Sequence, residues 1–503
     1  MRRFVLCLAG MAVMALPGLG QAQEWPGKYL SISEDGLVVV YLRESDGQLE
    51  GGLLLGYGLL FPFEGQAEGA VFRGELSGAE PRTLVEGQLE GDMLTVTLMQ
   101  DGKRQEFALE RQTGAERFGE ATSDESASPL LQMLALVPDV LDTRQGTPGV
   151  AFVDLRALEA AAGVESPGTA AAYEEMSEEA RDAWSAALQR VRVGPAELLA
   201  YRNAQMEGMP GLVGFEWFDI ERLLAYGAPP ASVTVLAAEV DSGRLAERLA
   251  ARGFERVERH GVTIWHHQRD GALDLRSRDP ADPFGANMGR AQRIAVLPGH
   301  LANSAYWRAT EAVTAAHAGH APALADSPEY RALAEAVSDS STGALLQAVF
   351  LHPMEVGVMP GDPIRPMEPG REQAGERSPG TNPEEADGDE LPWYGLAVLA
   401  DRQEGGERVS VVALLYQDAA TARAAAEVLA RRLASFAAAV AAGTALGIDE
   451  PRVHVSESGL AAAVASVRVA PSAEGEIPRG GFAAWLDALY RRELAILQIT
   501  GAH

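Results

Sequence analysis

The chain has 503 residues, a formal net charge of −29 and a hydrophobic fraction of 47%. Such an acidic surface repels nucleic acid and anionic lipid, which argues against both as general partners. The hydrophobic fraction is typical of globular proteins, so we expect most of the chain to fold.

Residues 1–22 have the pattern of a cleavable secretory signal peptide. Two arginines precede the apolar run Phe4–Leu16, and Gly20 and Ala22 stand at the positions that a signal peptidase reads. A membrane anchor is the weaker alternative, because this run is shorter than the roughly 20 residues that cross a bilayer. We therefore expect an exported protein, periplasmic or secreted.

Cleavage would remove the only cysteine, Cys7, which stands too early in the chain to be a lipoprotein cysteine. The mature protein would then contain no disulfide and no thiolate. Loss of Arg2 and Arg3 would change the net charge from −29 to −31. Lys28 and Lys103 are the only lysines, and no later run of 18 apolar residues predicts a transmembrane helix.

Residues 25–111 predict an all-β meander that closes into a small barrel or near-barrel. Short alternating segments follow one another at roughly ten-residue spacing and are separated by turns such as Asp35-Gly36 and Asp101-Gly102. The predicted strands are Lys28–Ile32, Leu37–Arg43, Leu49–Leu55, Leu59–Gln66, Ala70–Leu76, Thr83–Leu89, Met93–Met99 and Gln105–Glu110.

This stretch resembles the small meander domains of exported bacterial proteins that open on W-x-G-x-Y and end on an F-x-L-x-R strand. The corresponding residues are Trp25–Tyr29, with a different spacing, and Phe107–Arg111. A similar barrel holds an apolar ligand in lipocalins. We favour the alternative of a filled adhesion or spacing module, because side chains alone can fill an eight-stranded barrel.

Two polar segments divide the rest of the chain. Residues 112–128 are acidic and poor in large apolar groups, and we expect a linker there. Residues 359–392 are rich in Pro, Glu and Asp, which predicts a disordered acidic insertion. The segments on either side, 129–358 and 393–503, are expected to form two α+β subdomains.

Each of these subdomains contains a predicted strand–helix–strand–strand unit. In the first, a strand at Ser232–Ala238 precedes a helix capped by Asp241 and a hairpin around His260-Gly261. In the second, a strand at Val409–Tyr416 precedes a long helix and another hairpin. This order is the half-unit of ferredoxin-like folds, so we predict two equivalent ferredoxin-like subdomains.

Residues 130–350 and 393–500 resemble a family of uncharacterised exported bacterial proteins known only as a domain of unknown function. The resemblance depends on apolar and turn patterns, such as Leu136-Val137-Pro138, Gly214–Gly227, Val233–Trp265 and Arg293–Tyr330. It implies an exported α+β protein, and it transfers no catalytic residue to this chain.

Common catalytic motifs are missing from the sequence. It contains no P-loop, no H-E-x-x-H zinc motif, no G-x-S-x-G elbow and no S-x-x-K pair. We therefore assign no catalytic, cofactor-binding or metal-binding residue, and no cofactor.

Histidines are the remaining candidates for a site. His266 and His267 should point to opposite faces of a strand, whereas His317 and His320 could share a helix face and ligate a metal. Two ligands are fewer than a metal site usually needs, so we do not predict one. We interpret Asp279–Gly285 as a turn cluster in preference to a calcium loop, because the distal glutamate is absent.

Two functional hypotheses follow. The favoured one is a non-enzymatic exported protein that binds a protein partner or a small ligand in the cell envelope. The alternative is an envelope hydrolase with a non-standard acid or histidine site, for which a pocket lined by ionisable groups would be the evidence.

Overall fold

The protein is a mixed α+β structure in which all strand pairs are antiparallel. The computed structural model describes residues 25, 27–33, 36–45, 48–55, 59–76, 82–100, 102–111, 127–139, 149–227, 232–338, 343–352, 391–440, 446–469, 481–491 and 495–497. The predicted signal peptide, residues 112–126 of the predicted linker and residues 359–390 of the predicted insertion lie outside this set.

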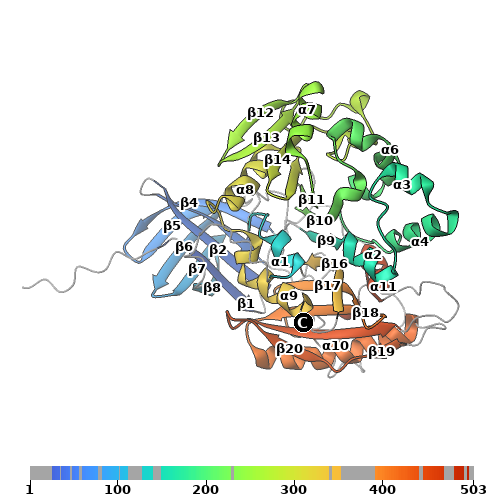
Figure 1. The fold of residues 1–503 in the computed structure, drawn as a ribbon. Coiled ribbons are helices and arrows are strands. Elements are labelled where there is room, and N and C mark those ends of the chain that lie inside the picture. Colours follow the sequence, from blue (N-terminus) through green and yellow to red (C-terminus); the bar gives the residue numbers. More distant parts are fainter. Residues whose placement is uncertain are drawn as a thin grey trace, which may run out of the picture.

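The N-terminal unit, which we call the meander domain, consists of eight strands that pair in chain order (Figure 1). They are β1 (Gly27–Ser33), β2 (Gly36–Ser45), β3 (Gln48–Leu55), β4 (Leu59–Glu68), β5 (Val71–Leu76), β6 (Thr83–Glu90), β7 (Met93–Gln100) and β8 (Lys103–Arg111). The predicted strands match these to within two residues at each end. β1 also pairs with β8 at Tyr29 and Leu30, so hydrogen bonding returns from the last strand to the first.

Aromatic side chains pack against one another inside the meander domain. Phe72 stacks on Phe63 with ring centroids 5.4 Å apart and meets Trp25 edge-on at 5.5 Å. All three rings are buried in one cluster within this domain, which favours the filled interior over the hollow one. Leu30 packs instead into the core of the larger unit, because neighbours in a strand point to opposite faces.

The described strands from Val150 to Val469 form one 13-stranded antiparallel sheet. Its order begins β12 (Glu255–Arg259), β13 (Val262–His267), β14 (Gln292–Leu297), β15 (His300–Ser304), β11 (Val233–Ala238), β10 (Ile220–Tyr226) and β9 (Val150–Asp154). It continues with β16 (Gly343–Leu351), β17 (Ala397–Glu404), β18 (Glu407–Tyr416), β21 (Ala461–Val469) and β19 (Leu446–Ile448), while β20 (Arg452–Val455) also pairs with β21.

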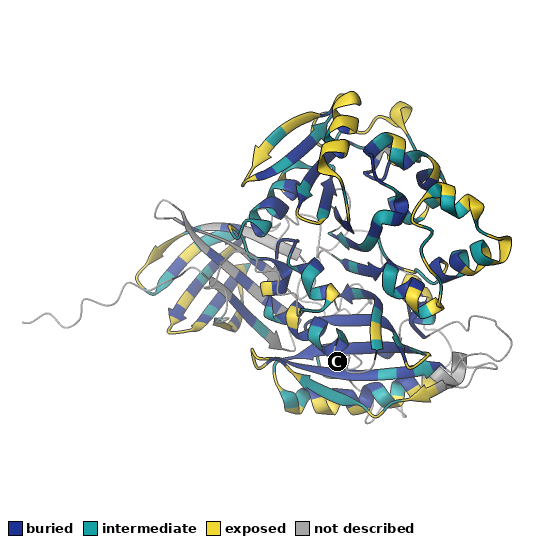
Figure 2. Cartoon of the chain, in the orientation of Figure 1, coloured by how far each residue is buried: buried dark blue, intermediate teal, exposed yellow. Residues whose placement is uncertain are grey.

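Helices cover both faces of this sheet, and Figure 2 shows buried residues along its central strands. One core contains residues of α2 (Leu155–Ala162), α4 (Glu178–Leu188), α5 (Ala196–Leu199), α6 (Arg202–Val213), α7 (Ser242–Ala251), α10 (Ala419–Val440) and α11 (Gly481–Tyr490). The opposite core contains residues of α1 (Pro129–Leu134), α8 (Trp307–His317) and α9 (Pro328–Ser338). The short helices are α3 (Ala170–Glu175), η1 (Trp217–Asp219), η2 (Leu275–Ser277), η3 (Ala286–Met288), η4 (Leu324–Asp326) and η7 (Ala495–Leu497). No helix within the described residues has the length and apolar character to cross a bilayer.

The strand order corrects the prediction of two equivalent ferredoxin-like units. In the second unit β18 lies next to β21, as that topology requires, but in the first β11 lies next to β15. The predicted hairpin β12–β13 extends the sheet beyond β14 and does not return to β11. Local patterns in the sequence identify strands. Which strands pair in the sheet depends on contacts between segments far apart in the chain, and no local pattern reveals these contacts.

The predicted boundaries around residues 359–392 also need correction. β16 and β17, which were assigned to different subdomains, are neighbours over eight residue pairs, so one sheet crosses the predicted division. Leu391 is only 2% exposed and belongs to the larger core, so the packed body begins before the predicted end of the insertion.

Candidate ligand-binding site

The structure separates the histidines that the sequence singled out. His266 packs against Trp307 and His267 against Phe254, on opposite sides of β13 as expected. His320 does not pair with His317. Its Nδ1 lies 3.1 Å from Nδ1 of His260 at the hairpin turn. Among the described residues, no three His, Cys, Asp or Glu side chains are grouped closely enough to hold a metal.

The Asp279–Gly285 segment is a turn stabilised by a buried aspartate. Asp282 forms an ion pair with Arg252, accepts a hydrogen bond from the Phe284 backbone N–H at 2.7 Å and another from Gln292 at 2.9 Å. Its carboxylate is thus used inside the protein, in agreement with the turn interpretation.

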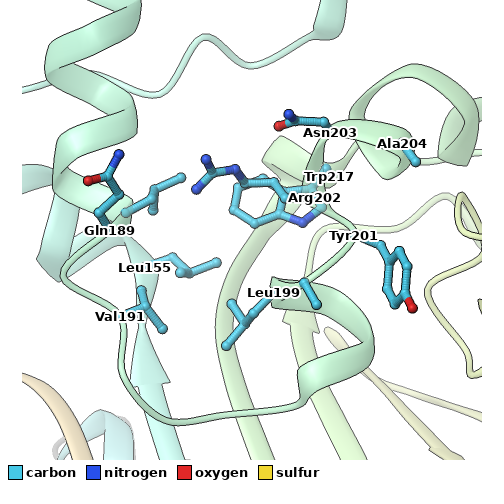
Figure 3. A pocket seen from close by; sticks show the side chains of 11 residues that line it. Leu155, Gln189, Val191, Leu199, Tyr201, Arg202, Asn203, Ala204 and Trp217 are labelled. Carbon is cyan, nitrogen blue, oxygen red and sulfur yellow. The ribbon is translucent and has the colours of Figure 1, made fainter.

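A cavity of about 480 Å³ lies between the C-terminal end of α4, α5, the first turn of α6 and η1 (Figure 3). Leu155, Leu188, Val191 and Leu199 supply apolar walls. Its volume is within the usual range for small-molecule pockets, which combine apolar walls with a few placed polar groups. The polar groups therefore decide what the cavity can bind.

Trp217 is the most buried polar group in the wall. It is 2% exposed, and its indole Nε1 has no hydrogen-bond partner among the described residues. Its ring is fixed edge-on against Trp184 at 5.9 Å and against Phe218 at 6.0 Å. Figure 3 shows the indole nitrogen on the side of the ring that faces the Leu199–Tyr201 segment.

The short helix η1 holds Trp217 in this place. Asp219 accepts a hydrogen bond from the Glu216 backbone N–H at 2.7 Å, and its own N–H donates to the Glu216 carbonyl at 3.1 Å, which closes the turn at the helix start. Trp184 is anchored in turn by donating its indole N–H to Glu159 at 2.9 Å. The two tryptophans differ in that only the indole nitrogen of Trp217 lacks an acceptor.

Arg202 is the one cavity-lining residue with a formal charge. Its guanidinium lies over the Trp184 ring at 5.5 Å from the ring centroid, a cation–π contact. No carboxylate within the described part of the chain forms an ion pair with it, and its buried Nε has no hydrogen-bond partner. Burial lowers the pKa of Arg202 below the usual arginine value.

The same arginine is the first residue of α6, which begins without a side-chain cap. Tyr201 occupies the N-cap position and accepts no capping hydrogen bond. The first N–H groups of a helix have no partner inside it, and they carry a partial positive charge. Asn203 and Ala204, in this first turn, also line the cavity.

A buried polar network fixes the α4 side of the cavity to the sheet. Gln347 on β16 accepts a hydrogen bond from the Arg192 backbone N–H at 2.9 Å and donates one to the Arg190 carbonyl at 2.9 Å. Gln347 also donates to Asp401 at 3.1 Å, and the Arg190 guanidinium lies 3.5 Å from the same carboxylate. The segment that carries Val191 is therefore held rigidly.

Sequence reasoning did not single out Arg202 or Trp217. An arginine in the first turn of a helix is an unusual feature, because its positive charge is repelled by the positive end of the helix dipole. The helix itself was not predicted, since Gly208, Pro210 and Gly211 are poor helix formers. Burial of Met209 and Val213 offsets that cost.

No protein-family model matches this chain, and no curated protein or solved structure is significantly similar to it. The resemblance to exported bacterial proteins therefore stays a prediction.

Proposed function

We propose that this protein is exported to the periplasm or beyond and binds a small ligand in the cavity between α4 and α6, without catalysing a reaction. The observation that carries the proposal is the cavity of about 480 Å³ itself, whose apolar walls of Leu155, Val191 and Leu199 surround one charged side chain, Arg202. Small-molecule sites have this combination of apolar walls and a few placed polar groups.

The surroundings of Trp217 support a binding site. Its ring is held by aromatic neighbours, and the opposite wall is fastened to the sheet through Gln347. A site whose walls are fixed before binding loses little conformational entropy when the ligand enters.

We further propose that the meander domain is a closed, filled small barrel that serves as a spacing or adhesion module. Support comes from the packed rings of Trp25, Phe63 and Phe72. The hydrolase alternative stays a prediction, and no contact among the described residues favours it.

A thermal-shift screen against small metabolites of all charge types tests the binding proposal. Ligands that raise the melting temperature of the wild type should not raise that of Ala204→Trp, because the indole would occupy the cavity. Ala424→Trp is the matched control, since Ala424 is exposed on α10 and does not line the cavity. Absence of any hit, or hits that Ala204→Trp retains in full, would contradict the proposal.

A further inference from the structure

Two histidine side chains from different elements meet on the surface of the protein. His260 lies in the turn between β12 and β13, and His320 follows the C-terminal end of α8 (Figure 1). Their Nδ1 atoms are 3.1 Å apart, and the two rings are inclined by 73° with centroids 5.1 Å apart. Both residues are exposed, so a solute can reach this pair of nitrogens directly.

The turn that carries His260 fixes its backbone. His260 and Gly261 have φ angles of 50° and 76°, the geometry of a two-residue type I′ hairpin turn. A residue with a side chain is strained in this left-handed region by about 1–2 kcal/mol, and asparagine or glycine is the ordinary choice there. An imidazole at this position is therefore present in spite of the backbone geometry.

The end of α8 fixes His320. Gly319 has a φ of 70°, and the His320 backbone N–H donates to the Ala315 carbonyl at 2.8 Å, which ends the helix in a Schellman turn. An ion pair between Arg259 and Glu311, 3.3 Å from Nε to Oε1, joins the hairpin to the same helix. Because both rings stand on tight turns of elements in contact, little conformational entropy is lost when they bind one ligand together.

The separation of the two nitrogens fits a metal chelate. An imidazole nitrogen binds Zn²⁺ at about 2.0–2.1 Å. Two such bonds place the nitrogens about 2.9 Å apart in the square-planar arrangement and about 3.3 Å apart in the tetrahedral one. The observed 3.1 Å lies between these two values. One cation can therefore bind both rings at once.

The type of ligand atom decides which cation fits. Imidazole nitrogens suit Cu²⁺, Ni²⁺ and Zn²⁺, whereas Mg²⁺ and Ca²⁺ take oxygen ligands. Cu²⁺ binds a given nitrogen site most tightly of these metals. The net charge of −29 also raises the concentration of cations near the protein surface. Among the described residues no third His, Cys, Asp or Glu completes a metal-binding group, so water would fill the other coordination positions.

We propose that His260 and His320 form a two-histidine surface site for a divalent transition metal, and that Cu²⁺ is the metal it binds most tightly. This site shares no residue with the cavity between α4 and α6, so the proposal does not depend on the proposed function. A bound metal would link the β12–β13 hairpin to the end of α8. Metal binding should therefore raise the melting temperature of the protein.

Calorimetric titration of the protein without a polyhistidine tag tests the site. Cu²⁺ should bind more tightly than Ni²⁺ or Zn²⁺. Loss of an outer-shell partner of a metal already weakens binding by about 10- to 100-fold. His260→Asn and His320→Asn each remove a direct ligand, so each should weaken Cu²⁺ binding by about tenfold or more.

His260→Asn is the sharper of the two variants, because asparagine is favoured in a type I′ turn. The melting temperature of its metal-free form should be unchanged or higher, which separates loss of a ligand from loss of the fold. His454→Asn is the matched control, because His454 lies on β20 and forms an ion pair with Glu335 at 3.5 Å. It should leave the affinity for Cu²⁺ unchanged.

Pulsed EPR of the protein loaded with less than one equivalent of Cu²⁺ counts the coordinated imidazoles. The wild type should show two, and His260→Asn and His320→Asn should each show fewer. Failure of Cu²⁺ to bind, or unchanged Cu²⁺ affinity in either variant, would overturn the proposal and leave a hydrogen-bonded pair of histidines only. A bound Cu²⁺ without imidazole ligands, or an equal loss of affinity in His454→Asn, would also overturn it.

Discussion

Replacing Asp401 by asparagine should strongly destabilise the sheet where the two predicted subdomains meet. Asp401 is fully buried on β17, and its Oδ2 lies 3.3 Å from Arg408 Nη2, 3.5 Å from Arg190 Nε and 3.1 Å from Gln347 Nε2. Both arginine side chains are also nearly buried, at 8% and 11% exposed. Asparagine would remove the negative charge. Its side-chain NH2 group would also add a hydrogen-bond donor to a site where the facing groups of Arg190, Arg408 and Gln347 are already donors.

Breaking a buried ion pair from one side costs about 3–5 kcal/mol, because the remaining charge stays buried without compensation. We expect Asp401→Asn to lower the free energy of unfolding by this amount. The matched control is Glu86→Gln in the Arg73–Glu86 pair, whose side chains are 38% and 66% exposed. An exposed pair contributes less than about 1 kcal/mol.

Urea denaturation followed by tryptophan fluorescence measures both variants. Trp184 and Trp217 report on the same side of the sheet, since both belong to the larger core that Asp401 supports through Arg190 and Gln347. A loss for Asp401→Asn no larger than that for Glu86→Gln would refute the reasoning. It would mean that this cluster is solvated or rearranges at little cost.

Two further predictions concern acid stability and the packing of the meander domain. Burial lowers the pKa of His352 to about 3, so the unfolded chain binds a proton below about pH 6.5 while the folded protein stays neutral. The free energy of unfolding is therefore unaffected by His352 protonation above pH 6.5 and falls as the pH drops from 6.5 to 3. At pH 5 the loss is about 2 kcal/mol. Urea unfolding at pH 8 and 5 should show a smaller acid loss in His352→Gln, and an equal loss would contradict the assignment. Gly87→Ala should cost about 1–3 kcal/mol, because the added Cβ would overlap the buried Phe72 ring. A variant as stable as the wild type in urea would show that the ring can move aside.

Local signals in the sequence predicted much of the secondary structure. Asp241 was expected to cap a helix, and its side chain accepts hydrogen bonds from the backbone N–H groups of Gly243 and Arg244 in the first turn. Strand alternation placed His266 and His267 on opposite faces. These features depend on residues a few positions apart, which is the range that a single sequence reveals.

Features that depend on distant contacts were missed. The neighbour of β11 is β15 and not β13, and the continuous sheet between β16 and β17 joins segments separated by the whole acidic insertion. The cavity has the same origin, because Leu155, Arg202 and Trp217 come from separate elements. No spacing in the sequence indicates that these three side chains meet.

The most direct test of the binding account is a crystal structure of the protein soaked with the metabolite that raises its melting temperature most. The account predicts ligand density in the cavity between α4 and α6, against Leu155, Val191 and Leu199. A cavity without ligand density, or a ligand bound only elsewhere on the protein, would contradict it.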